Sequence, residues 1–278
     1  MNYAHVFHAG NFADVFKHAL LARILVYLMR KDAPLRVIDT HAGEGAYDLT
    51  REEAARSGEW RGGVGLLPAL ADNAARALLQ PYLDCLGACD AAGRPALYPG
   101  SPLIAAQLLR AQDRALFCEM HPRAYAALQT RFARDRRVKT FAMDGWQGLS
   151  AFTPPPERRG LVLIDPPFEQ RDEFAQMARA GAKAFSKWRT GVFAFWYPVK
   201  DARAVEHFIA TMRADCDGPA LRLEIAVDGP RAGGLTRTGL LVLNPPYVLE
   251  EEARTLLPAL ARLMERAAGQ GVALIEPL

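Results

Sequence analysis

Residues 37–45 read Val-Ile-Asp-Thr-His-Ala-Gly-Glu-Gly, an apolar run that ends in an acid and is followed by a short glycine turn. Such a run is typical of a buried strand, and glycines after it let the backbone approach a nucleotide-like ligand without a Cβ in the way. A dinucleotide fingerprint would need glycine at position 48, where this chain has Asp48, so the pattern fits NAD poorly. Taken alone, the turn also fits a plain strand connection.

Further β-rich runs follow this strand, and helical stretches separate them. This alternation predicts an α/β protein with a doubly wound, mostly parallel sheet. Several runs are nearly continuous in apolar residues, as expected when helices cover both faces of the sheet. A ligand is therefore expected beyond the carboxyl ends of the strands. The expected strands are 35–40, 115–119, 138–143, 160–164, 191–196, 221–227 and 239–244, and the expected helices include 13–31, 123–134, 172–188, 202–214 and 250–268.

Residues 48–96 break this alternation. The segment has no good strand pattern, and its helical stretches are separated by Gly58, the Gly62-Gly63 pair and Pro68. We therefore predict a single Rossmann-like domain over residues 1–278, with a small helical insertion subdomain at residues 48–96.

The composition excludes several classes of protein. The chain has 278 residues, 50% hydrophobic and 23% charged, which is typical of a globular rather than a disordered protein. No apolar run reaches the ~18 residues of a membrane span, and the first residues do not resemble a signal peptide, so we expect a cytoplasmic protein without membrane contact. The four cysteines lack zinc-like spacing, and no metal is expected. Since the sequence has no long exposed apolar helix, we expect a monomer.

Acidic side chains follow the next two expected strands. Glu119 ends the second strand, where a carboxylate usually accepts hydrogen bonds from ribose hydroxyls. It lies much farther from the glycine turn than the usual ~20 residues, and the helical insertion accounts for the excess. Asp144 and Gly145 follow the third strand, where an acid is suited to accept from the amino group of an adenine. Either acid alone would fit a surface loop, but in this order the two support each other.

The sharpest motif lies at residues 161–168, which read Leu-Val-Leu-Ile-Asp-Pro-Pro-Phe. The exocyclic amine of adenine is a poor nucleophile because its lone pair is delocalised into the ring. The Asp165 carboxylate and the Pro166 carbonyl, held by prolines that restrict φ, can accept its two N–H groups and direct the lone pair at a methyl donor. Phe168 can stack on a base flipped out of its helix. A structural Pro-Pro turn after a strand is the alternative reading.

A second motif of the same kind occurs at residues 244–247, Asn-Pro-Pro-Tyr. This tetrapeptide also occurs in methyltransferases with this chemistry. The catalytic motif should follow the fourth strand, beside the cofactor strand at the switch point of the sheet, and Asp165 has that position. Asn244 ends the last expected antiparallel pair, so we interpret it as structural.

Together these motifs resemble the RlmJ family of 23S ribosomal RNA adenine-N6 methyltransferases, which use S-adenosyl-L-methionine. The resemblance covers nearly the whole chain, and the family also has a helical subdomain inserted in its Rossmann-like core. It implies that S-adenosyl-L-methionine, which leaves as S-adenosyl-L-homocysteine, is held by His18, His41, Ser101, Glu119, Asp144, Gly145 and Asp165. It also implies that Tyr3 touches the RNA. The matching segments are 8–18, 39–43, 98–102, 119–122, 144–145, 165–168, 196–198 and 244–246.

This chain departs from the family at Phe168, where tyrosine is more frequent; the stacking face is kept and a hydroxyl is lost. His18 and His41 would otherwise be interpreted as packing or loop histidines. Base flipping and direct transfer of the methyl group to the exocyclic amine follow as the expected mechanism, with Asp165, Pro166 and Phe168 as the catalytic residues.

Two other functions fit the same motifs. A DNA adenine-N6 methyltransferase is an alternative because the tetrapeptide selects the amine and not the sugar. A nucleic-acid-binding protein of the same fold without turnover is disfavoured because the whole tetrapeptide is intact. For the RNA partner, free or early-assembly 23S ribosomal RNA is expected, with the basic segments 131–139 and 183–189 helping to hold phosphates.

Overall fold

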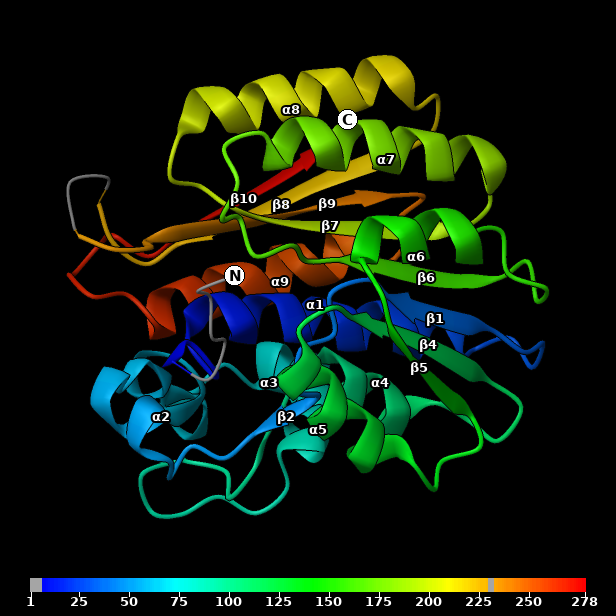
Figure 1. The fold of residues 1–278 in the computed structure, drawn as a ribbon. Coiled ribbons are helices and arrows are strands. Elements are labelled where there is room, and N and C mark those ends of the chain that lie inside the picture. Colours follow the sequence, from blue (N-terminus) through cyan, green and yellow to red (C-terminus); the bar gives the residue numbers. More distant parts are fainter. Residues whose placement is uncertain (1–6, 230–232) are drawn as a thin grey trace.

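The protein is described by a computed structural model that covers residues 7–229 and 233–278. In these residues a main sheet of eight strands has the order β10-β8-β9-β7-β6-β1-β4-β5, with helices on both faces (Figure 1). The strands are β1 (Arg36–Asp39), β4 (Arg114–Glu119), β5 (Val138–Ala142), β6 (Gly160–Ile164), β7 (Val192–Pro198), β8 (Ala220–Ala226), β9 (Arg237–Leu243) and β10 (Val272–Pro277).

The sheet is mostly parallel, as predicted. Strands β5, β4, β1, β6 and β7 pair in parallel, whereas β9 runs antiparallel to both β7 and β8, and β10 is antiparallel to β8. The chain passes from β1 outward to β4 and β5 and then returns to β6 on the other side of β1. This reversal creates a switch point between β1 and β6, where doubly wound sheets bind ligands. The predicted Rossmann-like α/β fold is confirmed.

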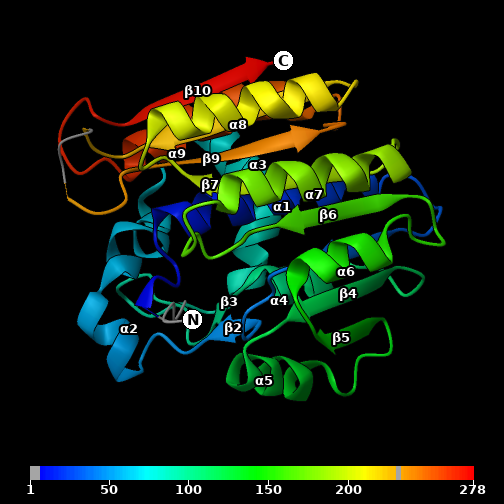
Figure 2. The ribbon, with the colours of Figure 1, turned by 45° about the horizontal axis from the view of Figure 1, so that its top comes forward.

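Two layers of helices cover the sheet because its central strands are apolar on both faces (Figures 1 and 2). Val37 and Leu161 face a core shared with α1, and the adjacent Ile38 and Val162 face the opposite core. The first layer contains α1 (Phe12–Leu28), α3 (Asn73–Leu86), α4 (Ser101–Leu108), α5 (Pro122–Phe132) and α9 (Leu249–Leu263), and the second contains α6 (Gly145–Phe152), α7 (Glu173–Lys187) and α8 (Ala202–Asp215).

Residues 48–96 add no strand to the main sheet. They form α2 (Glu52–Ser57), two short 3-10 helices (Glu59–Gly62 and Val64–Ala69) and α3. Two strands outside the expectation, β2 (Ala46–Tyr47) and β3 (Tyr98–Pro99), pair antiparallel and bring the two ends of the segment together. Helix α3 packs on α1 and α9 and shares their core, so the segment is joined to the main domain by a continuous apolar contact. Its status as a separate subdomain stays a prediction.

The expected strands are all present, with ends that differ by at most two residues, but β10 was not predicted. This edge strand is only half-buried and ends in Pro277, so it lacks the continuous apolar pattern of the central strands. Helix α1 begins one residue earlier than expected because Asn11 caps it: its Oδ1 accepts from the backbone N–H groups of Ala13 and Asp14, each at 3.0 Å.

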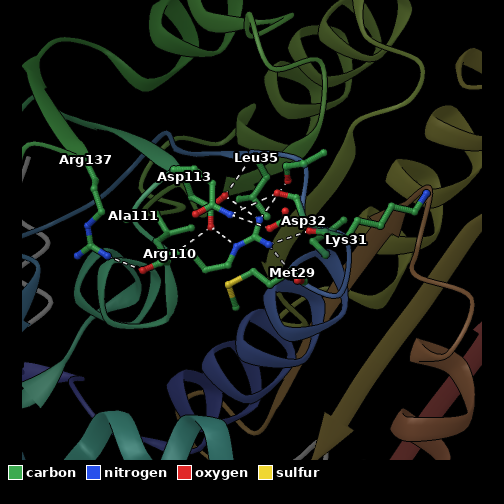
Figure 3. Close-up of polar contacts among 12 residues, drawn as sticks. Met29, Lys31, Asp32, Leu35, Arg110, Ala111, Asp113 and Arg137 are labelled. Atoms are coloured by element: carbon green, nitrogen blue, oxygen red, sulfur yellow. Dashed lines mark hydrogen bonds and ion pairs between the residues drawn. The ribbon is translucent and has the colours of Figure 1, made fainter.

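An ion pair between Arg110 and the buried Asp113 lies at the amino-terminal ends of the strands (Figure 3). The Arg110 guanidinium donates to Asp113 and to the backbone carbonyls of Met29, Lys31 and Ala33. Asp113 also accepts from the N–H of Leu35 at 3.1 Å. These bonds join the loop before β1 to the loop before β4, which aligns the two strands whose opposite ends carry the site.

In the part of the chain that the structure describes, the helices are too short or too polar to cross a membrane.

Candidate functional site

A cavity of about 1050 Å³ opens at the carboxyl ends of β1, β4, β5 and β6. It lies at the switch point of the sheet. All the site residues expected from the sequence within residues 7–278 line it, and Tyr3 lies outside the described residues. The lining set includes His18, His41, Ser101, Glu119, Asp144, Gly145, Asp165, Pro166 and Phe168.

The glycine turn after β1 is joined to the acid that ends β4. The backbone N–H of Gly43 donates to Glu119 Oε2 at 2.8 Å, and the N–H of His121 donates to Oε1 at 2.6 Å. Gly43 has a φ of +61°, and a Cβ there would lie 2.3 Å from Tyr47 Oη. The turn therefore needs glycine, and it presents the Glu119 carboxylate at the wall of the cavity.

Asp144 and Gly145 bring the start of α6 against the loop after β1. Asp144 Oδ1 accepts from the N–H groups of Trp146 and Gln147 at 2.9 and 3.0 Å. A Cβ on Gly145 would lie 2.2 Å from the Thr40 carbonyl oxygen and 2.6 Å from His41 Nε2. Gly145 is therefore required for this close approach.

Asp165 is held by a lysine that the sequence did not single out as a site residue. Lys17 Nζ lies 2.5 Å from Asp165 Oδ2 and 3.1 Å from Asp14 Oδ1, and the side chains of Lys17 and Asp14 are buried. Burial alone would lower the pKa of Lys17, but the charges of Asp165 and Asp14 outweigh it and raise that pKa above its usual value. Lys17 therefore stays charged beside the tetrapeptide. Lys17 was not predicted as a site residue because it lies in the apolar pattern of a helix.

Phe168 is held in an uncommon backbone conformation. Its φ of +51° is rare for a bulky residue. Its ring meets Phe174 edge-on at 4.9 Å and Trp196 at 5.9 Å between centroids. The loop after Pro167 is thus packed so that Phe168 lines the cavity.

Asp39 supports the site from behind the cavity wall. Ser101 Oγ donates to its Oδ2 at 2.7 Å, and the N–H of His41 donates to its Oδ1 at 3.2 Å. Burial raises the pKa of Asp39 to about 6, although the hydrogen bond from Ser101 opposes the shift. The carboxyl group at the end of β1 therefore orients two of the expected cofactor-binding residues.

His41 is a neutral side chain at pH 7. Burial lowers its pKa to about 4, against the smaller opposing effects of Asp165 and Asp144. Its Nδ1 lies 2.9 Å from Thr40 Oγ1, and the same hydroxyl lies 3.1 Å from the Leu163 carbonyl, so the ring is held against the loop after β1.

The depressed pKa of His41 gives a testable pH dependence. As pH falls below 6.5, the ordinary pKa of histidine, His41 binds a proton in the unfolded chain. In the folded chain it does not bind that proton until the pH reaches about 4. Stability is therefore lost in this window. We expect His41→Asn to remove the loss, so that the variant gains about 2 kcal/mol relative to the parent protein between pH 7.5 and pH 5. Urea unfolding at both pH values measures it. The exposed His207→Asn should show no such gain, and an equal gain there would contradict the assignment.

Asn244 lies on the side of the sheet opposite the cavity, beside the amino-terminal end of β7. Because β9 is antiparallel to β7, the end of β9 lies beside the start of β7. Asn244 Nδ2 donates to the carbonyls of Arg189 and Gly191 at 2.6 and 2.9 Å, and Tyr247 is 79% exposed. This placement supports the structural interpretation of residues 244–247.

The basic segments expected to hold phosphates also lie mostly beside the amino-terminal ends of the parallel strands, opposite the cavity. Residues 133–137 lead into the start of β5, and residues 188–191 lead from α7 into β7. Arg137 is engaged by Asp135 and by the carbonyls of Ala106 and Leu109. This placement away from the cavity does not favour the expected role of these segments, which stays a prediction, because a count of charges along the chain does not show beside which ends of the strands each loop lies. The exposed cations Lys200 and Arg266 line the cavity instead.

Residues 7–229 and 233–278 contain no cluster of three or more histidine, cysteine or acidic side chains arranged to hold a metal ion.

Comparison with known proteins identifies close relatives. The family described as "Ribosomal RNA large subunit methyltransferase D, RlmJ" matches residues 32–275. A protein of Escherichia coli K12 named ribosomal RNA large subunit methyltransferase J is 39% identical over 260 residues, which cover 93% of this chain and 92% of that protein. The protein of the same name from Haemophilus influenzae is 38% identical over 270 residues, covering 95% of this chain and 94% of the relative.

A solved structure has the same fold. The crystal structure of a Legionella pneumophila protein superposes with a TM-score of 0.88 at 35% identity and covers 97% of this chain and 98% of its own.

Proposed function

This chain belongs to the RlmJ family of ribosomal RNA large subunit methyltransferases, and from that membership we propose that it methylates N6 of an adenine in 23S ribosomal RNA. The observation that carries the proposal is the position of Asp165-Pro166-Pro167-Phe168, which line the cavity at the switch point beside the glycine turn. An adenine amine that reaches this loop would meet two acceptors and an aromatic ring.

The residues of the cavity fit S-adenosyl-L-methionine. Gly43 and Gly145 keep its walls free of side chains at points where a Cβ would clash, and a cavity of about 1050 Å³ is large enough for a nucleoside with an amino-acid chain. We assign Glu119 to the ribose hydroxyls and Asp144 to the adenine amine of the cofactor, with His18, His41, Ser101, Gly145 and Asp165 completing the pocket. The bound cofactor supplies an electrophilic methyl group on sulfur and leaves as S-adenosyl-L-homocysteine.

Asp165 and Pro166 orient the amine of the substrate. Lys17 contacts Oδ2 of Asp165, and Oδ1 has no hydrogen-bond partner among the described residues, so it is available to one N–H of the amine. The Pro166 carbonyl accepts from the other. With both N–H groups engaged, the nitrogen lone pair points away from the loop, toward the methyl donor. Because Lys17 neutralises Asp165, the carboxylate serves as an acceptor, and the proton of the methylated amine can leave to water.

Phe168 supports base flipping in this proposal. Its ring lies at the cavity wall and is fixed by Phe174 and Trp196, so it can stack on an extruded adenine without first becoming ordered.

An incubation with labelled S-adenosyl-L-methionine tests the function. Protein-free 23S ribosomal RNA, transfer RNA and duplex DNA are compared, and the product is digested to nucleosides. Label in N6-methyladenosine from 23S RNA is the expected result. Label from duplex DNA alone would favour the DNA methyltransferase, and binding of the cofactor with no transfer to any substrate would favour a non-catalytic binding protein.

Glu119→Ala should weaken cofactor binding. Two ribose hydroxyls lose an ionised acceptor, which costs about 1.5–3 kcal/mol. Calorimetry with S-adenosyl-L-homocysteine measures the loss. Glu169→Ala, another acid at the cavity wall, serves as the control. Equal affinities for the Glu119→Ala variant and the parent protein would exclude the ribose assignment.

The cations at the cavity should contact RNA phosphates. We expect Lys200→Gln with Arg266→Gln to weaken RNA binding and to lower the slope of log affinity against log salt by about 0.7 for each phosphate that is no longer neutralised. Arg134→Gln with Arg136→Gln removes the same charge from the loop before β5, on the side of the sheet opposite the cavity, and should leave the slope unchanged. Filter binding across a salt series measures both. Equal slopes for the two double variants would mean that the RNA is held elsewhere.

We further propose that the enzyme works as a monomer in the cytoplasm, on free or early-assembly ribosomal RNA, and that residues 48–96 form an inserted subdomain.

A further inference from the structure

The inserted segment, residues 48–96, lies against the loop before α1. The backbone N–H of Val64 donates to the Gly10 carbonyl at 2.8 Å. A Cβ on Gly63 would lie 2.2 Å from that carbonyl oxygen, so glycine is required where the two backbones meet. Gly10 itself has a φ of +79°, which favours glycine. The inserted segment therefore fixes the path of the chain into α1.

Glu59 adds a charged contact at the same place. Its Oε2 accepts from Asn11 Nδ2 at 2.9 Å, and its Oε1 lies 3.0 Å from His8 Nδ1. Burial raises the pKa of Glu59, but the hydrogen bonds from His8 and Asn11 outweigh it and hold that pKa below its ordinary value. The ionised carboxylate can only accept, so both neighbours donate to it. All three residues line the cavity.

The side-chain amide of Asn11 is oriented from both of its ends. Its Oδ1 caps α1 by accepting from the N–H groups of Ala13 and Asp14, and its Nδ2 donates to Glu59. If the amide turned over, all three hydrogen bonds would be lost, because its nitrogen cannot accept and its oxygen cannot donate. Glu59 therefore holds the residue that caps α1.

The first turns of α1 connect this cap to the catalytic loop. Asp14 accepts from the Gly10 N–H at 3.0 Å and pairs with Lys17 at 3.1 Å. Lys17 Nζ in turn lies 2.5 Å from Asp165 Oδ2. A connected series of polar contacts therefore runs from Glu59, in the inserted segment, to the carboxylate of the tetrapeptide.

We propose that Glu59 is a positioning residue through which the inserted segment holds the start of α1, and with it Lys17 and Asp165, in the geometry of methyl transfer. The inference rests on the proposed function. Lys17 reaches Asp165 from α1, so a shift of the start of the helix would move the ammonium and the carboxylate paired with it. A small displacement of a group that orients the reacting amine lowers the rate strongly.

An exchange of amide and carboxylate tests the contact. Asn11→Asp keeps an oxygen that can cap α1 but places a second carboxylate against Glu59. Single-turnover methyl transfer at saturating RNA and cofactor, counted per folded molecule, should fall about tenfold. Adding Glu59→Gln should restore the rate to within about threefold of the parent protein, because the glutamine amide can donate to the carboxylate introduced at position 11.

Asp72→Asn is the matched control. It makes the same kind of exchange at the cap of α3, in the same inserted segment, where Asp72 accepts from the N–H groups of Ala74 and Ala75. Asp72 is exposed and does not line the cavity. Since asparagine caps helices as well as aspartate does, the rate per folded molecule should stay within about twofold of the parent protein. Urea unfolding gives the folded fraction of each variant.

The outcomes separate this inference from the proposed function. If Asn11→Asp lowers stability but leaves the rate per folded molecule unchanged, Glu59 only supports the fold and the inference is wrong. If Asn11→Asp lowers the rate and Glu59→Gln does not restore it, the loss does not act through Glu59 and the inference is also wrong. If the parent protein transfers no methyl group to any nucleic acid, the proposed function itself is wrong, and the inference is wrong with it.

Discussion

Replacing Asp165 by alanine is expected to lower the rate of methyl transfer by at least ~10²-fold, about 2.7 kcal/mol, as when one preorganised polar group is removed from an active site. The variant loses the acceptor that directs the amine lone pair, an interaction that matters most in the transition state. The fold should persist because Lys17 keeps its ion pair with Asp14 at 3.1 Å. Cofactor affinity should change far less than the rate.

Asn244→Ala is the matched control for this prediction. Its side chain holds two carbonyls of the loop before β7, at the edge of the sheet away from the cavity. We expect a loss of stability of about 1–2 kcal/mol and a nearly normal rate per folded molecule. Single-turnover rates on RNA with cofactor titrations decide between the two loops. A folded but inactive Asn244→Ala beside an active Asp165→Ala would make residues 244–247 the catalytic loop.

The sequence was sufficient to predict the parts of the site that lie in short, rigid motifs. Glu119 ends β4, Asp165 directly follows β6, and Gly43 lies in the turn after β1. Parallel strands bring their carboxyl ends together on one side of the sheet, so order along the chain predicts proximity in space. The same reasoning separates Asp165 from Asn244. Strand β9 is antiparallel to β7, so its last residue lies on the side of the sheet opposite the carboxyl ends of the parallel strands.

The residues that sequence reasoning missed act through long-range contacts. Lys17 is separated from Asp165 by 148 positions, and Tyr98 is separated from His18 by 80 positions. In sequence Lys17 is one lysine in an apolar helix, and nothing near it indicates that its charge is matched by two carboxylates. The same holds for the basic segments 131–139 and 183–189: their charge is visible in the sequence, but the ends of the strands beside which they lie are not.

Lys17→Met is expected to destabilise the fold by about 3–5 kcal/mol at pH 7, the usual cost of removing one partner from a buried ion pair. The substitution leaves the Asp14 and Asp165 carboxylates facing each other in a buried site with no ammonium between them. Asp14 keeps the hydrogen bond from the Gly10 N–H at 3.0 Å, which does not neutralise its charge. Lys183→Met, which removes an exposed lysine from α7, should cost less than about 0.5 kcal/mol.

The pH dependence of this loss separates a charge effect from a packing effect. In the parent protein the raised pKa of Lys17 means that its contribution is complete below the ordinary value of 10.5, so it is constant between pH 5 and pH 8. In Lys17→Met the folded chain can relieve the repulsion by binding a proton, so the variant should recover stability as pH falls from 8 toward 5. Adding Asp165→Asn should recover part of the same loss at pH 7, because only one buried carboxylate then remains. Urea unfolding of the four proteins at both pH values measures these differences. A deficit that stays the same at both pH values and in the double variant would mean that Lys17 contributes packing alone, and that Asp165 does not depend on it for a counter-charge.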